Sequence, residues 1–355
     1  MLICLSKAFL LTVPPNATFS IDVSIPAMSK DERTAVYKRA EEIVKQAFAR
    51  QPSYDDLVPA LLKLGVEKLA TECTMRVGVP IKPMLGNITK DLNDMAKILE
   101  GRQFTCEYKS PPSPSEHHSP RGQHPVPIVL KLIRVSRYDG QRAQIHLSST
   151  GKISIFSRHL ELMTEKYPDL VALIPRICIP TTNSFILEGE IVPVDSSGSV
   201  KPFQTLAGRA KKAVPLSSVK VQVCLYAFDL MCLNGESLLA RSLRERRALL
   251  RAGFIEVANQ FTFVRSMDAT SREQDELLAF FKGAVESKCE GIMVKVLDEM
   301  SAEEVEAAER AKAEGKASRR KALPATYGIP FGSLRHNSLV LFCSLTSRKN
   351  PINAR

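Results

Sequence analysis

The sequence predicts an α+β protein with a largely antiparallel sheet, preceded by a helical region. Two observations lead to this fold class. Residues 30–74 carry apolar side chains at helical spacing, whereas from about residue 100 short runs of β-branched and aromatic residues occur between helical stretches. Such a mixture is typical of an antiparallel sheet with helices packed against it. The length of 355 residues suffices for two or three domains.

The helical region contains two units and ends at a connector. Ser29 stands where an N-cap is expected, and Asp31 and Glu32 suit a first helical turn. The apolar stripe of this first helix consists of Val36, Ile43, Val44 and Phe48. Residues 53–73 predict a second, shorter unit, and residues 77–87, with two prolines and two glycines, predict an extended connector at a domain boundary.

The first residues superficially resemble a secretion signal. Their apolar run is short, is broken by Ser6 and Lys7, and follows no basic region, which favours a helix end packed in a core. No run of about 18 or more apolar residues occurs, so the sequence predicts no membrane-spanning helix and no membrane partner.

The region after residue 100 supplies the strands. The expected strands are FTCEY (104–108), RAQIHL (142–147), KISIFS (152–157), SFILEGEIVPV (184–194), VKVQVCLYAFDLM (219–231) and GIMVKVL (291–297). Residues 242–254 and 271–287 are expected to be helical. Two segments differ: residues 110–127 hold six prolines and favour unpacked chain, and residues 299–322 predict an exposed, charged arm.

Composition limits the possible partners. A formal net charge of +11 fits a polyanionic partner such as nucleic acid, and it fits a merely basic protein equally well. The eight cysteines form no CxxC pair, so neither a zinc site nor a disulfide framework is indicated. A reducing compartment is the simpler interpretation.

Several motifs follow one another in a specific order. They include PIKPMLGNITK, FTCEYK, YDGQRAQIH, KYPDL, FILEGEIV, PFQTL, YAFDL and CEGIMVK. In this order and spacing the chain resembles the replicative ATP-dependent DNA ligases, the DNA ligase I type of the nucleotidyltransferase superfamily, from about residue 5 to Tyr327. A lone lysine–x–Asp–Gly motif is weak evidence, but the ordered set is specific.

The resemblance implies a domain order and a reaction. It implies part of a helical DNA-binding domain over residues 1–78, an antiparallel-sheet adenylation domain over residues 79–327, and an unassigned tail over residues 328–355. The family forms a lysyl-AMP intermediate from ATP with Mg²⁺, transfers AMP to the 5′-phosphate of nicked duplex DNA, and seals the nick. The resemblance further implies a monomer that acts in replication, repair and recombination in the nucleus, with a replication clamp as a possible partner.

The resemblance also assigns site residues. Lys109 is the expected nucleophile, which must be partly neutral and therefore needs a desolvated or cation-rich site. Taken alone, a surface lysine at a strand end is the favoured interpretation, and the matching FTCEY strand reverses that preference. The other expected positions are Glu107 at adenine, Arg142 at ribose or phosphate, Arg158 at nucleotide and nicked DNA, Glu190 at ribose and metal, Phe228 stacked on adenine, Glu290 at Mg²⁺, and Lys295 at the α-phosphate. Arg142 could instead form a strand-surface ion pair, and Phe228 could be a core aromatic.

Two carboxylates on one strand carry a further expectation. Glu188 and Glu190 alternate along FILEGEIV and therefore face the same side. Paired carboxylates on a buried face are costly unless they meet a cation or a hydrogen-bonding ligand. Glu188 stands where the family usually has an aspartate.

The lysine motif is interrupted. Removing Ser110 to Arg137 joins FTCEYK to YDGQRAQIH and restores the family motif. Either this insert loops out and Lys109 still meets Tyr138, or residues 128–136 replace FTCEY as the strand before the turn. In the second case Arg137 takes the position of the nucleophile, and a guanidinium stays protonated and cannot attack phosphorus.

The tail departs from the family pattern as well. After residues 325–327 the family has two triphosphate-binding lysines and an OB-fold, and neither can be recognised in residues 328–355. The sequence therefore predicts an incomplete ligase, with weak sealing of pre-adenylated nicks and negligible sealing from ATP. The split motif and the divergent tail suggest untranslated sequence read as protein. The alternatives are a non-catalytic DNA- or partner-binding ligase fragment and an RNA ligase or capping-type guanylyltransferase.

Overall fold

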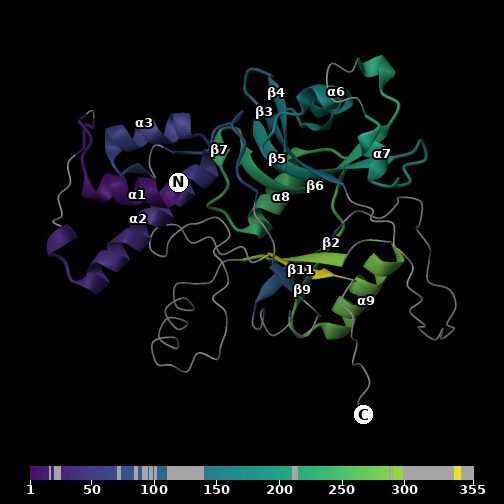
Figure 1. Ribbon diagram of the computed structural model, residues 1–355. Coiled ribbons are helices and arrows are strands. Elements are labelled where there is room, and N and C mark those ends of the chain that lie inside the picture. Colours follow the sequence, from purple (N-terminus) through teal and green to yellow (C-terminus); the bar gives the residue numbers. More distant parts are fainter. Residues whose placement is uncertain are drawn as a thin grey trace, which may run out of the picture.

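Two β-sheets with packed helices and an N-terminal helical unit make up the computed structural model (Figure 1). The structure describes residues 1–15, 17–19, 25–69, 73–83, 87–89, 95, 99, 102–109, 140–209, 215–287, 289, 291–298 and 340–344. The α+β fold class predicted from the sequence is confirmed. The insert at residues 110–137, the arm at 299–322 and Glu290 lie outside the described residues.

The N-terminal unit consists of three helices, α1 (Leu2–Leu11), α2 (Lys30–Arg50) and α3 (Tyr54–Leu64), with a short 3₁₀ turn at Ile25–Ala27. Ser29 caps α2 as predicted, and Glu32 completes a capping box by accepting a hydrogen bond from the Ser29 backbone. Phe9 of α1 packs in one cluster with Ile43 and Val44 of α2. The prediction that the first residues form a helix packed in a core is therefore confirmed.

The larger sheet has the strand order β4-β3-β5-β6-β7, with β8 beside β6. Its strands are β3 (Gln141–Leu147), β4 (Ile153–Ser157), β5 (Phe185–Val194), β6 (Gln222–Leu233), β7 (Glu236–Ser237) and β8 (Phe261–Phe263). All pairs are antiparallel except β6 with β8. We call this sheet B; the four strands predicted within residues 142–231 correspond to β3, β4, β5 and β6.

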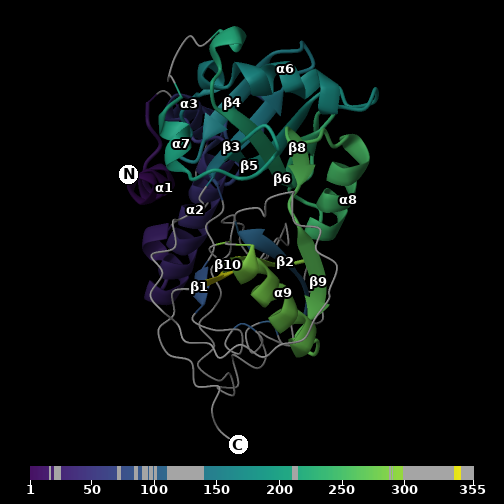
Figure 2. The same cartoon turned by 90° about the vertical axis from the view of Figure 1, so that its right-hand side faces the viewer.

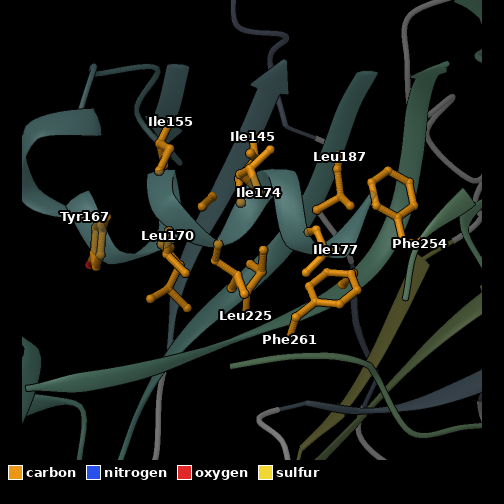
Figure 3. Packing of buried hydrophobic residues seen from close by; sticks show 14 of the residues in the cluster. Ile145, Ile155, Tyr167, Leu170, Ile174, Ile177, Leu187, Leu225, Phe254 and Phe261 are labelled. Carbon is orange, nitrogen blue, oxygen red and sulfur yellow. The ribbon is translucent and has the colours of Figure 1, made fainter. Parts of the chain in front are cut away.

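One face of sheet B is apolar and is covered by α6 (Pro168–Ile177). Leu170, Ile174 and Ile177 of this helix lie over Ile145 and Leu187 of the strands (Figure 3). Further 3₁₀ turns at Thr164–Lys166 and Leu216–Ser218 and the short helix α7 (Gln204–Ala207) complete this part. The opposite face of sheet B carries the polar side chains of the site described below.

The smaller sheet, sheet A, has the order β1-β11-β10-β2-β9. Its strands are β1 (Asn87–Thr89), β2 (Gln103–Lys109), β9 (Ser266–Thr270), β10 (Gly291–Val296) and β11 (Val340–Ser344). The helix α9 (Gln274–Glu286) packs on one face, where the rings of Tyr108 and Phe280 lie 4.6 Å apart. FTCEYK thus forms an interior strand with β10 and β9 on its two sides. The competing segment 128–136 is outside the described residues.

The strand β11 was not anticipated. It belongs to the tail of residues 328–355 that the sequence left unassigned, and it lies between β1 and β10. It pairs antiparallel with β10 and parallel with β1. A five-residue strand has too short a pattern to be distinguished by periodicity, and only its two neighbours specify it.

Helix α8 (Leu243–Gly253) lies beside both sheets (Figure 2). Towards sheet B, Arg246 forms a buried ion pair with Asp229 of β6 at 2.9 Å. Towards sheet A, Arg247 donates a hydrogen bond to the Thr105 hydroxyl at 2.8 Å and pairs with Asp268 at 2.5 Å. The arginines of one helix therefore connect the two sheets. None of the described helices is long and apolar enough to cross a bilayer.

Loss of the Asp229 charge is expected to destabilise the protein strongly. The Asp229→Asn change leaves a buried guanidinium without its counter-charge, which costs about 3–5 kcal/mol of unfolding free energy. Urea unfolding at neutral pH measures this loss. The matched control is Asp298→Asn, because its partner Arg244 is on the same helix but both side chains are exposed, so at most about 1 kcal/mol is expected.

The same ion pair predicts a dependence on pH. Burial raises the pKa of Asp229, but the charge and hydrogen bonds of Arg246, the Lys295 ammonium and the Leu230 N–H together lower it by more, so the carboxyl titrates below its usual range. A depressed folded-state pKa stabilises the protein above the unfolded pKa, and this contribution is lost as the pH falls from about 5. Stability of Asp229→Asn should therefore fall less on acidification than that of the unchanged chain. Equal slopes would contradict the assignment.

Candidate functional site

Alternate residues of β2 form a polar face on sheet A. Thr105, Glu107 and Lys109 alternate with the apolar residues that pack in the α9 cluster, so they point to the opposite side. In the antiparallel register, Lys295 of β10 lies directly opposite Thr105 and shares this face. The face thus brings two lysines and a glutamate to one surface, a combination suited to a ligand with both anionic and hydrogen-bonding groups.

Glu107 has one paired and one unpaired oxygen. Its Oε2 lies 2.6 Å from Nζ of Lys295, and both side chains are buried. Its Oε1 is buried and has no hydrogen-bond partner in the described part of the chain. Burial raises the pKa of Glu107 by more than the Lys295 ammonium lowers it. A buried acceptor without a donor costs about 1–3 kcal/mol, so a ligand that donated a hydrogen bond to this oxygen would remove that cost.

Phe228 is turned out of the core by a β-bulge. Along β5 and β6, Glu188 is opposite Asp229 and Gly189 is opposite Ala227, so the ladder passes over Phe228. The side chain is half-buried and belongs to none of the hydrophobic clusters of the described residues. The alternative of a plain core aromatic is therefore not what the structure shows.

Two cations lie over the Phe228 ring. The Lys295 Nζ is 4.5 Å from the ring centroid, and the Arg142 Cζ is 5.4 Å from it. Lys295 comes from sheet A and Arg142 from sheet B, so the ring marks the place where the two polar faces meet. An aromatic ring flanked by cations is suited to a flat heteroaromatic group that carries negative charge nearby.

Side chains on the face of sheet B opposite α6 hold Arg142 in place. Its guanidinium pairs with Oε2 of Glu188 at 2.5 Å, and Oε1 of Glu188 accepts a hydrogen bond from Gln144 at 2.8 Å. The ion pair that the sequence suggested as an alternative for Arg142 is thus present, and the same guanidinium also lies over the Phe228 ring. The cation that the buried Glu188 requires is supplied by the protein itself.

Glu190 lies beside Arg142 and approaches Gly140 closely. The register places Glu190 opposite Arg142, on the same side as Glu188, as predicted. The Gly140 backbone N–H donates to Oε1 of Glu190 at 3.0 Å. A Cβ at position 140 would lie 2.3 Å from Cγ of Glu190, so this close approach requires glycine. The glycine of the YDG motif therefore leaves room for the Glu190 carboxylate of the FILEGEIV motif.

The structure brings most of the predicted residues together. Glu107, Lys295, Phe228 and Arg142 form a continuous chain of contacts across the two sheets. The half-buried Lys109 shares the face of Glu107 at the end of β2. Of the other predicted site residues, Arg158 is exposed and lies directly after β4, and Glu290 is outside the described residues.

The sequence did not predict two features of this site. The ion pair between Glu107 and Lys295 joins residues that were assigned to opposite ends of a nucleotide. Gln144 was not singled out, although its position two residues after Arg142 on the same strand face was a usable signal.

Comparison with known proteins identifies the family. The sequence profile described as ATP dependent DNA ligase domain matches residues 132–309, half of the chain. The chain belongs to the ATP-dependent DNA ligase family. It is 37% identical to DNA ligase 3 of Schizosaccharomyces pombe over 84% of this chain and 34% of that protein. Against DNA ligase 1 of Saccharomyces cerevisiae the values are 36%, 84% and 35%.

The chain thus spans about a third of the length of these relatives. Among solved structures, the ligase domain of M. tuberculosis LigD matches 61% of this chain and 53% of that chain with 22% identity and a TM-score of 0.38. The matched profile begins after Lys109 and includes the YDG that follows the insert, so the profile match does not depend on Lys109 itself.

The residues present fit a divalent cation of the kind that ligation uses. Mg²⁺ in nucleotide sites is held by one or two carboxylates together with substrate phosphates and waters. The half-buried carboxylate of Glu190, whose Oε1 is oriented by Gly140, matches such a donor. No group of three or more metal-binding side chains occurs among the described residues.

The close approach at Gly140 predicts a local defect when a side chain is added. Gly140→Ala should displace the Glu190 carboxylate and weaken ATP binding at least several-fold in a titration with Mg²⁺, because the added Cβ overlaps Cγ of Glu190. Gly208→Ala is the control, since its Cβ would meet only the Thr205 carbonyl at 3.4 Å. Unchanged ATP affinity in Gly140→Ala would show that Glu190 is not part of the nucleotide site.

Proposed function

We propose that this chain catalyses the first step of ATP-dependent DNA ligation, the transfer of AMP from ATP to Lys109. The observation that carries the proposal is the buried Oε1 of Glu107, which has no hydrogen-bond partner among the described residues. Glu107 pairs with Lys295, which lies over the Phe228 ring, and is two residues from Lys109 on the same strand face. A base that donates a hydrogen bond to Glu107 has its sugar and phosphates within reach of the remaining site residues.

The base-binding part consists of Glu107 and Phe228. A carboxylate oxygen accepts hydrogen bonds, and the exocyclic amino group of adenine is a donor that fits the unpaired Oε1. The Phe228 ring offers a flat surface for stacking, which is worth about 1–3 kcal/mol per base. Adenine binding also satisfies a buried acceptor, so the ligand removes a desolvation penalty that the free protein carries.

The phosphate-binding part consists of cations already held by the fold. Lys295 and Arg142 both lie over the Phe228 ring, so both charges are near the place where a nucleotide would extend from its base. Fixed positive charges that need no rearrangement stabilise the charge developing on a reacting phosphate. Lys295 can serve there only after exchanging part of its pairing with Glu107 for the ligand.

The reaction forms one bond and breaks another. Nζ of Lys109, after losing a proton, bonds to the α-phosphorus as the bond to the bridging oxygen breaks and pyrophosphate leaves. Mg²⁺, held by Glu190 and Glu290, would neutralise charge on the phosphates during this step. Attack requires that Lys109 is directed at phosphorus, which its place at the end of β2 on the Glu107 face supports.

The later steps belong to the same proposal. AMP passes from Lys109 to the 5′-phosphate of nicked duplex DNA, with the exposed Arg158 contacting DNA and the N-terminal helical unit gripping the backbone. The names of the relatives support DNA as substrate, and eukaryotic DNA ligases imply action in the nucleus. A monomeric state and a replication-clamp partner are further parts of this proposal.

The decisive experiment is covalent labelling. After incubation with Mg²⁺ and ATP labelled in the α-phosphate, mass spectrometry should find AMP on the peptide that contains Lys109. Lys109→Ala should abolish the label, whereas Lys152→Ala, at an exposed turn, should retain it. A label that persists in Lys109→Ala overturns the assignment, and no label on the unchanged chain favours a non-catalytic DNA- or partner-binding fragment.

A second prediction concerns the ring. Phe228→Leu should raise the ATP dissociation constant by about 5- to 150-fold, because stacking on the base is lost. The melting temperature should change little, since Phe228 is outside the core clusters. Isothermal titration measures the affinity, and Phe203→Leu, at an exposed phenylalanine, is the matched control. An equal affinity of Phe228→Leu and the unchanged chain would exclude stacking.

A further inference from the structure

The connector after the helical unit is attached to β3 through side chains. The Gly78 N–H donates to Nδ1 of His146 at 2.9 Å. Both backbone groups of Ile81 bind Gln144: its N–H donates to Oε1 at 2.9 Å, and its carbonyl accepts from Nε2 at 2.6 Å. The Gln144 amide thus forms with Ile81 the pair of hydrogen bonds that the backbone of a neighbouring strand would form. The Lys82 N–H donates to the Ala49 carbonyl of α2 at 3.1 Å, which links the connector to the helical unit.

One face of β3 runs from the connector to the candidate nucleotide site. His146, Gln144 and Arg142 are two residues apart on one strand, so they share a side. His146 contacts the connector, Arg142 lies over Phe228, and Gln144 is between them. The strand therefore presents an ordered set of polar groups between two parts of the protein that are distant in sequence.

The orientation of the Gln144 amide is determined by its partners. Nε2 has two hydrogens, and they go to the Ile81 carbonyl and to Oε1 of Glu188 at 2.8 Å. A reversed amide would set its oxygen against these two acceptors and its nitrogen against the Ile81 N–H. Gln144 is buried, so each of these hydrogen bonds is made without competition from bulk water.

Glu188 transmits this position to Arg142. Its carboxylate is almost fully buried, with one oxygen bound to Gln144 and the other to the Arg142 guanidinium at 2.5 Å. A carboxylate held at both oxygens has a defined plane, and the guanidinium paired with it has a defined place over Phe228. Without the Gln144 amide, Oε1 of Glu188 loses this donor, and the carboxylate that pairs with Arg142 is less firmly oriented.

We propose that Gln144 is a positioning residue for ATP binding: it joins the connector at Ile81 to Arg142 through Glu188. The inference rests on the proposed function, because it takes the Phe228 site to bind ATP. It adds that the ATP affinity of the Phe228 site depends on the path of the connector, and therefore on how the N-terminal helical unit docks. This unit contributes no described side chain to the site.

The first test is ATP affinity in a double-mutant cycle. Gln144→Leu keeps the volume and removes the amide, and it should weaken ATP binding about tenfold by titration, as expected for losing a hydrogen bond to a charged group. In an Arg142→Ala background the same change should have almost no further effect, because Gln144 acts through Arg142. Gln222→Leu, an exposed glutamine of β6, is the control and should bind like the unchanged chain.

The second test needs no nucleotide. In urea unfolding of the full chain, Gln144→Leu and Arg142→Ala should be less destabilising together than the sum of the two single changes, because both act on Glu188. Additive effects on both unfolding and ATP affinity overturn the inference. If the two changes are non-additive in unfolding but the unchanged chain does not bind ATP, the proposed function and the role of Gln144 in ATP binding are overturned. The structural connection from Ile81 through Gln144 and Glu188 to Arg142 would still hold.

Discussion

The arginines of α8 are the constraint on which the rest of the structure depends. Arg246 is bound to Asp229 of sheet B, and Arg247 is bound to Thr105 and Asp268 of sheet A, so one rigid helix sets the relation between the two sheets. The contact between Lys295 of sheet A and the Phe228 ring of sheet B crosses from one sheet to the other. A site divided between two sheets needs such a clamp, because neither sheet alone carries both parts.

Burial of charge follows from this arrangement. Glu107, Glu188 and Asp229 are all nearly inaccessible to water, and each has a basic partner, in turn Lys295, Arg142 and Arg246. Buried ion pairs contribute little net stability, since desolvation offsets their attraction, but they define geometry closely. Two of the three pairs lie at the Phe228 ring and one lies under α8. Their concentration at the meeting of the sheets is therefore better explained by positioning than by stability.

Sheet B has one apolar face beneath α6 and a second face on which polar side chains lie among apolar ones such as Ile186 and Val192. Along β5, Leu187 and Ile191 belong to the apolar cluster beneath α6, while Glu188 and Glu190 face the other way. The apolar face supplies the hydrophobic stabilisation, which leaves the second face able to carry polar groups. That second face binds the connector at one end and presents Arg142 at the other, so the strand order joins the helical unit to the candidate site.

Local pattern determined much of this protein from the sequence alone. Short stretches of sequence are enough to recognise three features: the cap at Ser29, the runs of β-branched residues that form β2 to β6, and the ordered motifs that mark the ligase family. They can be recognised locally because capping, strand propensity and motif chemistry act over a few residues. Tertiary structure alone decided the pairing of Glu107 with Lys295, the double role of Arg142, the place of β11 between β1 and β10, and the use of Gln144 as a strand-like partner for Ile81. Each of these depends on strand register or on the approach of two sheets. Those are set by contacts between residues far apart in the chain, and no local periodicity records them.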